Sequence, residues 1–273
     1  MIFVPYIARK QRLQLRSISK RLKESNATIG LDRDGVINKE PTKLSARDLA
    51  KIGLGKPSKY VDKVEHFLFK PTAKQALRNL HNSGFHIFLA TGKAGIGRGV
   101  QKPGEIKRPH WFMQKEISPN KHDPVIGTIL VATDGGNPKE PDNPDKQNKV
   151  VVGFNPKYLV CKPSIAFKKP KSGYGYAPTI FLKGPDAKKP NTAMFKVAQA
   201  KLGFEPSRTF YIGDEESDVK AGKSYGCPTI LIGSKKNWPA GKAQPDYFAR
   251  DLSEASKIAI AAVLGRRKLR VRN

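Results

Sequence analysis

Residues 32–38 have the sequence Asp-Arg-Asp-Gly-Val-Ile-Asn and directly follow a short apolar segment at 27–31, Ala-Thr-Ile-Gly-Leu. That segment predicts a buried strand, so the two aspartates lie where a strand ends. In extended chain the side chains of Asp32 and Asp34 project to the same side. Neighbouring carboxylates repel one another and Mg²⁺ prefers oxygen ligands, so the pair is a candidate cation site. Calcium loops and plain turns share this pattern, so its role stays open from spacing alone.

Strand and helix signals alternate along the rest of the chain. Further strands are predicted at 85–90, 126–132, 209–212 and 229–232, and helices at 71–83, 191–202, 219–225 and 252–264. Such alternation is typical of an α/β, Rossmann-like fold, in which helices flank a parallel sheet and ligands bind beyond the carboxyl ends of the strands. Two segments interrupt it. Residues 39–60 are predicted to be loop-like, and residues 137–183 form a candidate insertion.

Three more motifs follow this pattern. Thr91 and Gly92 end the second predicted strand, where a hydroxyl and glycine amides can hold phosphate oxygens. Lys189 precedes a proline and a helix, and its ammonium can neutralise phosphoryl charge. Asp214 and Asp218 follow the fourth predicted strand, in a chain that is short of acids. Each motif is weak by itself, since surface turns and solvated lysines account for it equally well.

In this order, the four motifs resemble those of the haloacid dehalogenase-like (HAD) phosphohydrolase superfamily, over about residues 27–262. The sequence is most similar to the branch of heptose-bisphosphate and histidinol-phosphate phosphatases. That branch shares the stretch Leu-Asp-Arg-Asp-Gly-Val-Ile-Asn, a Gly-Ile-x-Arg-Gly after the second motif and a Lys-Pro in the third. Gly-Ile-Gly-Arg-Gly at 95–99 also resembles the 3′-phosphatase domain of polynucleotide kinase. The resemblance implies the HAD fold.

The resemblance also implies a set of catalytic roles. Asp32 would be the nucleophile that forms an aspartyl-phosphate, and Asp34 would protonate the leaving oxygen and then activate water. Thr91, Gly92 and Lys189 would hold the phosphoryl oxygens. Phosphoryl transfer needs positioning and charge neutralisation above all, and these residue types provide both.

The cofactor implied by the resemblance is Mg²⁺. The expected metal residues are Asp32, Asp34 through its backbone carbonyl, Asp214 and Asp218, the last of which would orient Lys189 or a metal-bound water. The branch often carries a zinc loop of cysteine and histidine before the third motif. Only Cys161 lies in that region here, so zinc is not expected.

This chain departs from the branch beside the second motif. The relatives carry Asn-Gln-Ser after the threonine, whereas residues 92–94 here are Gly-Lys-Ala. The insertion at 137–183 also replaces or extends the part that would cover the site. The resemblance therefore does not extend to the relatives' substrate.

The charge of the chain points to a polyanionic partner. There are 51 Lys and Arg against 23 Asp and Glu, a formal net charge of +28. Each lysine or arginine that contacts a phosphate releases a condensed counterion, so nucleic acid is the expected partner, with RNA favoured weakly over DNA. The chain divides into a basic extension at 1–26, an HAD-like domain at 27–250, and a closing helix with a basic tail at 251–273. The candidate nucleic-acid-binding residues are Arg9, Lys10, Arg12, Arg16, Lys168, Lys169, Lys171, Arg266, Arg267, Lys268, Arg270 and Arg272.

Three functions remain open from the sequence. The first is a Mg²⁺-dependent phosphomonoester hydrolase bound to RNA or within a ribonucleoprotein. The second is a structural component of an organellar ribosome that binds rRNA and neighbouring ribonucleoprotein components and keeps the HAD fold as a scaffold. The third is a nucleic-acid 3′-end phosphatase. The arginine-rich start resembles a mitochondrial targeting segment, and no apolar run is long enough to predict a membrane span or a membrane partner.

Overall fold

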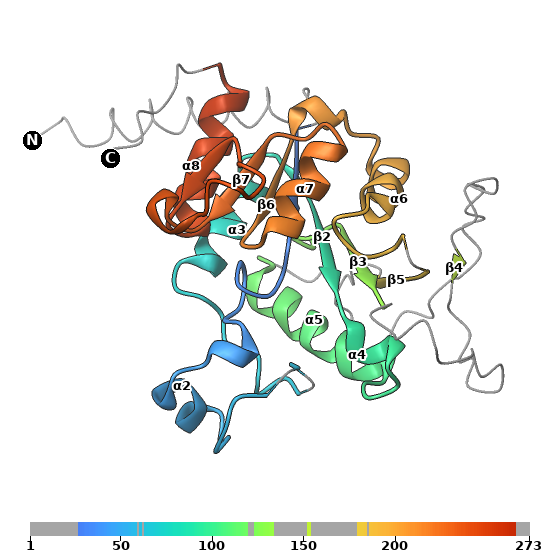
Figure 1. Ribbon diagram of the computed structural model, residues 1–273, viewed down its shortest axis with the longest axis vertical. Helices are drawn as coiled ribbons and strands as arrows, with labels where there is room; N and C mark the ends of the chain where they lie inside the picture. The colour runs from blue at the N-terminus through green and yellow to red at the C-terminus, as the bar shows by residue number, and fades with distance from the viewer. Residues whose placement is uncertain are drawn as a thin grey trace, which may run out of the picture.

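The computed structural model describes residues 27–265, apart from 59, 62, 120–122, 134–151, 154–178 and 185. Its centre is an eight-stranded sheet in the order β4-β5-β3-β2-β1-β6-β7-β8, and all neighbouring strands are parallel (Figure 1). The α/β Rossmann-like fold expected from the sequence is confirmed. The strands are β1 (Thr28–Leu31), β2 (His86–Gly92), β3 (Thr128–Ala132), β4 (Val152–Gly153), β5 (Thr179–Lys183), β6 (Thr209–Gly213), β7 (Thr229–Ile232) and β8 (Tyr247–Ala249).

Helices cover both faces of this sheet, so its central strands are apolar on both sides. Every residue of β1, β3 and β6 is buried. On one face, Leu77 of α3 and Ile258 of α8 pack in the same core as Ile29 of β1. On the other, Phe195 of α6 packs in a second core. The larger helices are α3 (Ala73–Asn82), α5 (Pro103–Ile117), α6 (Ala193–Leu202), α7 (Glu216–Ser224) and α8 (Leu252–Val263).

The strand register brings the sequence motifs to one edge. Leu31, the last residue of β1, is paired with Leu89 of β2 and with Ile212 of β6. Asp32 therefore leaves β1 next to the ends of its two neighbouring strands. Within the described residues, no helix combines the length and apolarity that a membrane span requires.

The structure differs from the sequence prediction in the two interrupting segments. Residues 39–60 were predicted to be loop-like, but they contain a 3₁₀ turn, Pro41–Lys43, and a short helix, α2 (Ala46–Lys51). The hydroxyl of Ser45 accepts a hydrogen bond from the Asp48 amide, and the Asp48 carboxylate accepts one from the Ser45 amide, which is why the helix begins there. Figure 1 shows α2 at the lower left, away from the sheet.

The candidate insertion at 137–183 includes part of the sheet. Of this segment the structure describes residues 152–153 and 179–183, which form β4 and β5. β5 pairs with β3, with Ile129 opposite Thr179 and Ala132 opposite Leu182. Residues 179–183 are therefore part of the central sheet. The other parts that the sequence did not predict are α4 (Ala94–Gly97), α5 and β8.

Candidate active site

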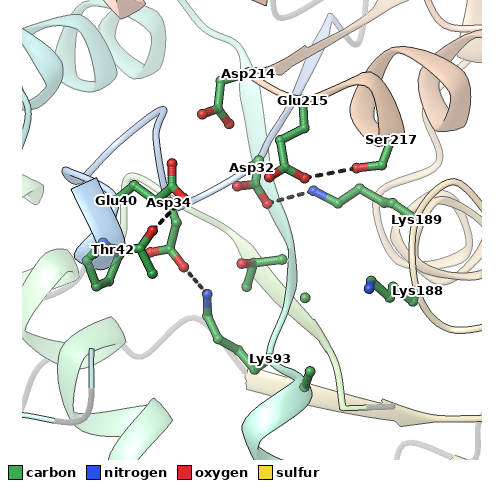
Figure 2. Close-up of a pocket in the computed structure, with 14 residues that line it drawn as sticks. Asp32, Asp34, Glu40, Thr42, Lys93, Lys188, Lys189, Asp214, Glu215 and Ser217 are labelled. Atoms are coloured by element: carbon green, nitrogen blue, oxygen red, sulfur yellow. Dashed lines mark hydrogen bonds and ion pairs between the residues drawn. The ribbon is translucent and has the colours of Figure 1, made fainter. Parts of the chain in front are cut away.

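A cavity of about 240 Å³ opens at the carboxyl ends of the strands. Acids and lysines line it together, and Figure 2 shows the side chain of Lys189 reaching Asp32 and that of Lys93 reaching Asp34. The acids are Asp32, Asp34, Glu40, Asp214 and Glu215; the lysines are Lys93, Lys188 and Lys189; Thr42, Thr91, Gly92 and Ser217 also line the cavity. The structure thus brings the residues of all four sequence motifs to one pocket.

Lys189 connects the first motif to the last. Its ammonium donates to Asp32 at 2.6 Å and to Asp218 at 2.5 Å, and all three side chains are nearly buried. A third bond reaches the hydroxyl of Tyr211 at 3.2 Å, and that hydroxyl donates to the carbonyl of Ala90 at 3.1 Å. Burial lowers the pKa of a lysine, but Asp218 and Asp32 reverse this effect and raise the pKa of Lys189 well above its usual value. Lys189 is therefore a fixed positive charge beside Asp32.

Burial raises the pKa of Asp32, an effect that Lys189 opposes. The backbone amide of Asp32 donates to the carbonyl of Ile212 at 3.0 Å, which extends the β1–β6 pairing by one residue. This bond and Lys189 hold the carboxylate at the mouth of the cavity. A carboxylate held by one cation and facing an open cavity is suited to nucleophilic attack.

Asp218 has partners on both oxygens. One oxygen accepts from Lys189, and the other accepts the backbone amides of Asp214 at 3.1 Å and Glu215 at 3.0 Å. Asp218 was predicted either to orient Lys189 or to act with the metal. With both oxygens engaged, the arrangement favours the orienting role.

Asp34 lies between two cations. Arg33 donates to it through a fork, at 2.8 and 3.2 Å from one nitrogen and 3.0 Å from another, and Asn38 adds a bond at 2.9 Å. The ammonium of Lys93 bonds to its second oxygen. Burial alone would raise the pKa of Asp34, but Arg33 and Lys93 hold that pKa well below its ordinary value. Asp34 is therefore held as a carboxylate here, and both cations oppose its predicted role as a proton donor.

The glycine-rich segment after β2 does not form the predicted row of free amides. Residues 94–97 form the short helix α4, and the amides of Ile96, Gly97 and Gly99 donate to the carbonyls of Lys93, Thr133 and Ile96. Of the predicted phosphate-binding residues, Thr91, Gly92 and Lys189 line the cavity. A side chain at position 92 would meet nothing within 4 Å, so Gly92 borders open space.

Comparison with known proteins agrees with this geometry. A family model described as HAD-hydrolase-like matches residues 187–255, which include Lys189, Asp214 and Asp218. A D-glycero-D-manno-heptose-1,7-bisphosphate 7-phosphatase of Chlorobaculum tepidum is 27% identical over 241 residues, or 85% of this chain and 93% of the relative. The enzyme of the same name from Thermosynechococcus vestitus is 24% identical and covers 82% of this chain and 91% of its own length. This chain is therefore similar, in sequence and in fold, to phosphatases of the HAD superfamily. Its relatives lie in the heptose-bisphosphate phosphatase-like branch.

Solved structures show the same HAD fold. The D,D-heptose 1,7-bisphosphate phosphatase of B. bronchiseptica, complexed with magnesium and phosphate, matches with a TM-score of 0.52 and 17% identity, covering 85% of this chain and 96% of that one. A putative HAD-like phosphatase from Mesorhizobium loti matches with a TM-score of 0.53 and 18% identity, covering 89% of each chain.

HAD phosphatases generally depend on Mg²⁺, and the residues of this chain fit that ion. The carboxylate of Asp214 has no hydrogen bond or ion pair among the described residues. Burial, together with the charges of Asp32, Asp218 and Glu215, raises its pKa to about 8. Gly35 has a φ of +78°, and a Cβ there would overlap an oxygen of Asp214, so the first motif is packed directly against this acid. The site thus holds negative charge that a divalent cation would balance.

The contacts of the acids reduce the number of candidate ligands for Mg²⁺. Among the described residues, no group of three or more His, Cys, Asp and Glu side chains is placed to hold a metal. The carboxylate of Asp34 is already engaged by Arg33, Asn38 and Lys93. Of the set that the resemblance implied, this leaves the carboxylates of Asp32 and Asp214 and the backbone carbonyl of Asp34.

Several residues of the HAD site were not predicted from the sequence. Lys93 and the buried Arg33 both bind Asp34, and a nitrogen of Arg33 donates to Nε2 of His110 at 3.2 Å. His110 is buried in α5, and burial, with Arg33, lowers its pKa well below the usual value, so it is neutral. Lys70 also reaches the motif, by donating to the carbonyl of Gly35. The departure at 92–94 was the one sequence signal for Lys93, and nothing in the sequence distinguished His110.

The candidate nucleic-acid-binding residues lie outside the described part of the chain. This holds for the N-terminal set, for the three lysines at 168–171 and for the arginines and lysine at 266–272. Their assignment stays a prediction.

Proposed function

We propose that this chain is a Mg²⁺-dependent phosphomonoester hydrolase that forms an aspartyl-phosphate on Asp32. The observation that carries the proposal is the buried contact of Lys189 with both Asp32 and Asp218, in a cavity where Asp214 forms no ion pair with any described residue. A structural scaffold gains nothing from like charges gathered in a cavity, because each buried carboxylate without a partner costs stability. A site that binds a cation and a phosphoryl group uses both the carboxylates and the lysines of this cavity.

The reaction follows from the contacts. An oxygen of Asp32 attacks phosphorus, the bond from phosphorus to the ester oxygen breaks, and the leaving oxygen takes a proton from solvent water. Water then attacks the aspartyl-phosphate, the bond from phosphorus to Asp32 breaks, and the proton that this water loses passes through the Asp34 carboxylate to solvent, which releases inorganic phosphate and restores both aspartates. Lys189 stays beside the phosphoryl oxygens through both steps and neutralises their charge. Mg²⁺, when bound by Asp32, Asp214 and the carbonyl of Asp34, would neutralise the remaining negative charge of the phosphoryl group.

The test is turnover of p-nitrophenyl phosphate by RNA-free protein, with and without Mg²⁺. We expect metal-dependent hydrolysis, and a fall of about a thousandfold or more in Asp32→Asn, because removal of a nucleophile removes the covalent route. Asp123→Asn is the matched control, since Asp123 is an exposed acid that pairs with His81 and does not line the cavity. Hydrolysis that is equally fast in Asp32→Asn would contradict the proposal.

A second proposed property is binding to RNA, as an enzyme within a ribonucleoprotein or as a structural component of one. It is supported by the net charge of +28, more than half of which is carried by residues outside the described part. Lysines and arginines in such excess release condensed counterions when they contact phosphates, which favours binding to a polyanion. The ribosomal and mitochondrial assignments, and action on nucleic-acid 3′-ends, stay predictions of the sequence.

A further inference from the structure

A basic loop follows β7 and lies outside the cavity. Residues 233–245, here named the β7 loop, have the sequence Gly-Ser-Lys-Lys-Asn-Trp-Pro-Ala-Gly-Lys-Ala-Gln-Pro, with three lysines and no acid. Lys235, Lys236 and Lys242 are exposed, and none of them forms an ion pair with a described residue. Elsewhere on the surface a lysine such as Lys74 is paired with a glutamate. The β7 loop therefore presents positive charge that no ion pair of the described chain neutralises.

The β7 loop is held in one shape by its own hydrogen bonds. The side-chain amide of Gln244 donates to the carbonyl of Lys242 at 3.0 Å and to that of Pro239 at 3.2 Å. The indole nitrogen of Trp238 donates to the carbonyl of Ala243 at 3.1 Å, which joins the two sides of the loop. A loop that is ordered before binding loses less conformational entropy when a ligand binds. The β7 loop is therefore suited to recognition.

Trp238 is an aromatic residue that the packing of the sheet does not use. It is half-buried and belongs to neither of the two apolar cores. The ammonium of Lys242 lies 4.9 Å from the centroid of its ring, so an aromatic surface and a positive charge occur side by side. This pair of features is typical of proteins that bind single strands, in which bases stack on aromatic rings and lysines contact the phosphates.

The β7 loop adjoins the mouth of the candidate active site. β7 is the parallel neighbour of β6, with Leu231 opposite Gly213, so the loop leaves the sheet at the edge that carries Asp214. The backbone amide of Ala243 donates to the carboxylate of Glu216 at 3.2 Å, and the residues on either side of Glu216 line the cavity. A polymer bound to the loop would therefore lie beside the site without occupying it.

Resting on the proposed binding to RNA, we propose that the β7 loop is a contact surface for single-stranded nucleic acid, in which a base stacks on Trp238 and the three lysines bind neighbouring phosphates. A single strand fits this surface because its bases are free to stack on a side chain, whereas those of a duplex are stacked on one another. RNA and DNA share this chemistry, so the test compares the two strands.

The contribution of the lysines is measured by fluorescence anisotropy of short labelled RNA and DNA strands with the full chain. Replacing the three lysines of the loop by glutamine should reduce the slope of log K against log salt by about 0.7 for each lysine that contacts a phosphate. The matched control removes three exposed lysines that also form no ion pair with a described residue, Lys51, Lys56 and Lys201. The same change of slope in both variants would overturn the inference.

The contribution of Trp238 needs two variants, because its ring also closes the loop. Trp238→Ala removes the ring and the bond to Ala243, whereas Trp238→Phe keeps an aromatic ring and removes only the bond. We expect Trp238→Ala to weaken binding of a single strand about tenfold and Trp238→Phe to weaken it by less than about threefold, the scale of base stacking on an aromatic side chain. Equal weakening by the two variants would assign Trp238 a structural role and contradict the proposed stacking.

Tryptophan fluorescence observes the contact directly. The chain has two tryptophans, so in Trp111→Phe the emission comes from Trp238 alone. We expect a single strand to quench this emission and a duplex of the same sequence to leave it nearly unchanged, and the strand that binds more tightly identifies RNA or DNA as the ligand. Binding by anisotropy without quenching would overturn this inference and leave the proposed RNA binding intact. No binding of any strand would refute both, and neither result depends on hydrolysis.

Discussion

At the scale of single residues, the site is a balance of buried charges. Lys189 is shared by two carboxylates, and Asp34 is shared by two cations, so each has a fixed protonation state. Asp214 is the exception, because no cation in the described structure pairs with it. Its pKa of about 8 follows from burial and from the acids around it, and this gives the protein a dependence on pH that a metal ion should remove.

The sign of that dependence follows from linkage. Asp214 keeps its proton in the folded, metal-free protein up to about pH 8, whereas in the unfolded chain it ionises near its ordinary value of 3.8. Folding therefore becomes less favourable as the pH rises toward 8. We expect the Tm of metal-free protein to fall by about 3 °C or more between pH 6 and pH 8.5, and excess Mg²⁺ to abolish this fall because it binds the ionised carboxylate.

Asp214→Asn is the control for this measurement, which calorimetry can make across the pH range. The variant should show a smaller fall of Tm with pH and little response to Mg²⁺. If the variant and the unmodified chain had the same pH dependence and the same response to Mg²⁺, the role given to Asp214 would be wrong.

At the scale of elements, the sequence predicts the helices and strands that have a regular apolar pattern and does not predict those that lack one. β1, β2, β3, β6 and β7 were predicted near their observed bounds, since each is a continuous apolar run of a buried parallel strand. β5 was missed because it follows a long polar tract, rich in lysine and glycine, that hides its start. α5 has two prolines, Pro103 and Pro109, that obscure its helical pattern.

The same reasoning applies to the site. Residues at strand ends could be predicted from the order of the motifs, because parallel strands end at one edge of the sheet. Arg33, His110 and Lys93 could not, because their roles depend on contacts between elements that are distant in sequence. A buried guanidinium and a buried imidazole look like surface residues in a sequence as basic as this one.

The place of β5 in the sheet can be tested by measuring the free energy of unfolding of variants of this protein. Leu182 is 1% exposed, and its carbonyl accepts both the amide and the hydroxyl of Thr133. We expect Leu182→Ala to lower the free energy of unfolding by about 2–4 kcal/mol, as for other buried leucines, in urea denaturation followed by circular dichroism. Lys201→Ala, on the exposed face of α6, should change it by less than about 0.5 kcal/mol. A decrease as small as that of the control would place residue 182 outside the core.

At the scale of the whole molecule, the chain carries a large excess of positive charge, at its ends and within residues 27–265. More than half of the net charge of +28 lies on residues outside the described part, including the basic ends. An enzyme that hydrolyses small esters has no need of that charge, whereas one that works on a polyanion gains affinity from it. The two proposed properties are therefore compatible.

Salt dependence measures how many of these charges bind phosphates. We expect the affinity for a fluorescent single-stranded RNA, followed by anisotropy, to fall steeply with salt. Replacing Arg266, Arg267, Lys268, Arg270 and Arg272 by glutamine should reduce the slope of log K against log salt by about 0.7 for each phosphate that the tail no longer neutralises.

A control variant removes the same charge from exposed positions of the described domain, Lys51, Lys56, Lys115, Lys201 and Lys220. It should leave the slope nearly unchanged. Equal slopes in both variants would show that net charge alone, and not a basic tail, governs the binding.

The attack of Asp32 on phosphorus can be observed by trapping the aspartyl-phosphate. Protein turning over p-nitrophenyl phosphate with Mg²⁺ is quenched in acid and treated with borohydride, which reduces an acyl phosphate to an alcohol, and the peptides are read by mass spectrometry. We expect Asp32 to be converted to homoserine, Asp34, Asp214 and Asp218 to stay unmodified, and omission of substrate to abolish the conversion. Turnover with no modified aspartate, or with the modification at another acid, would contradict nucleophilic attack by Asp32.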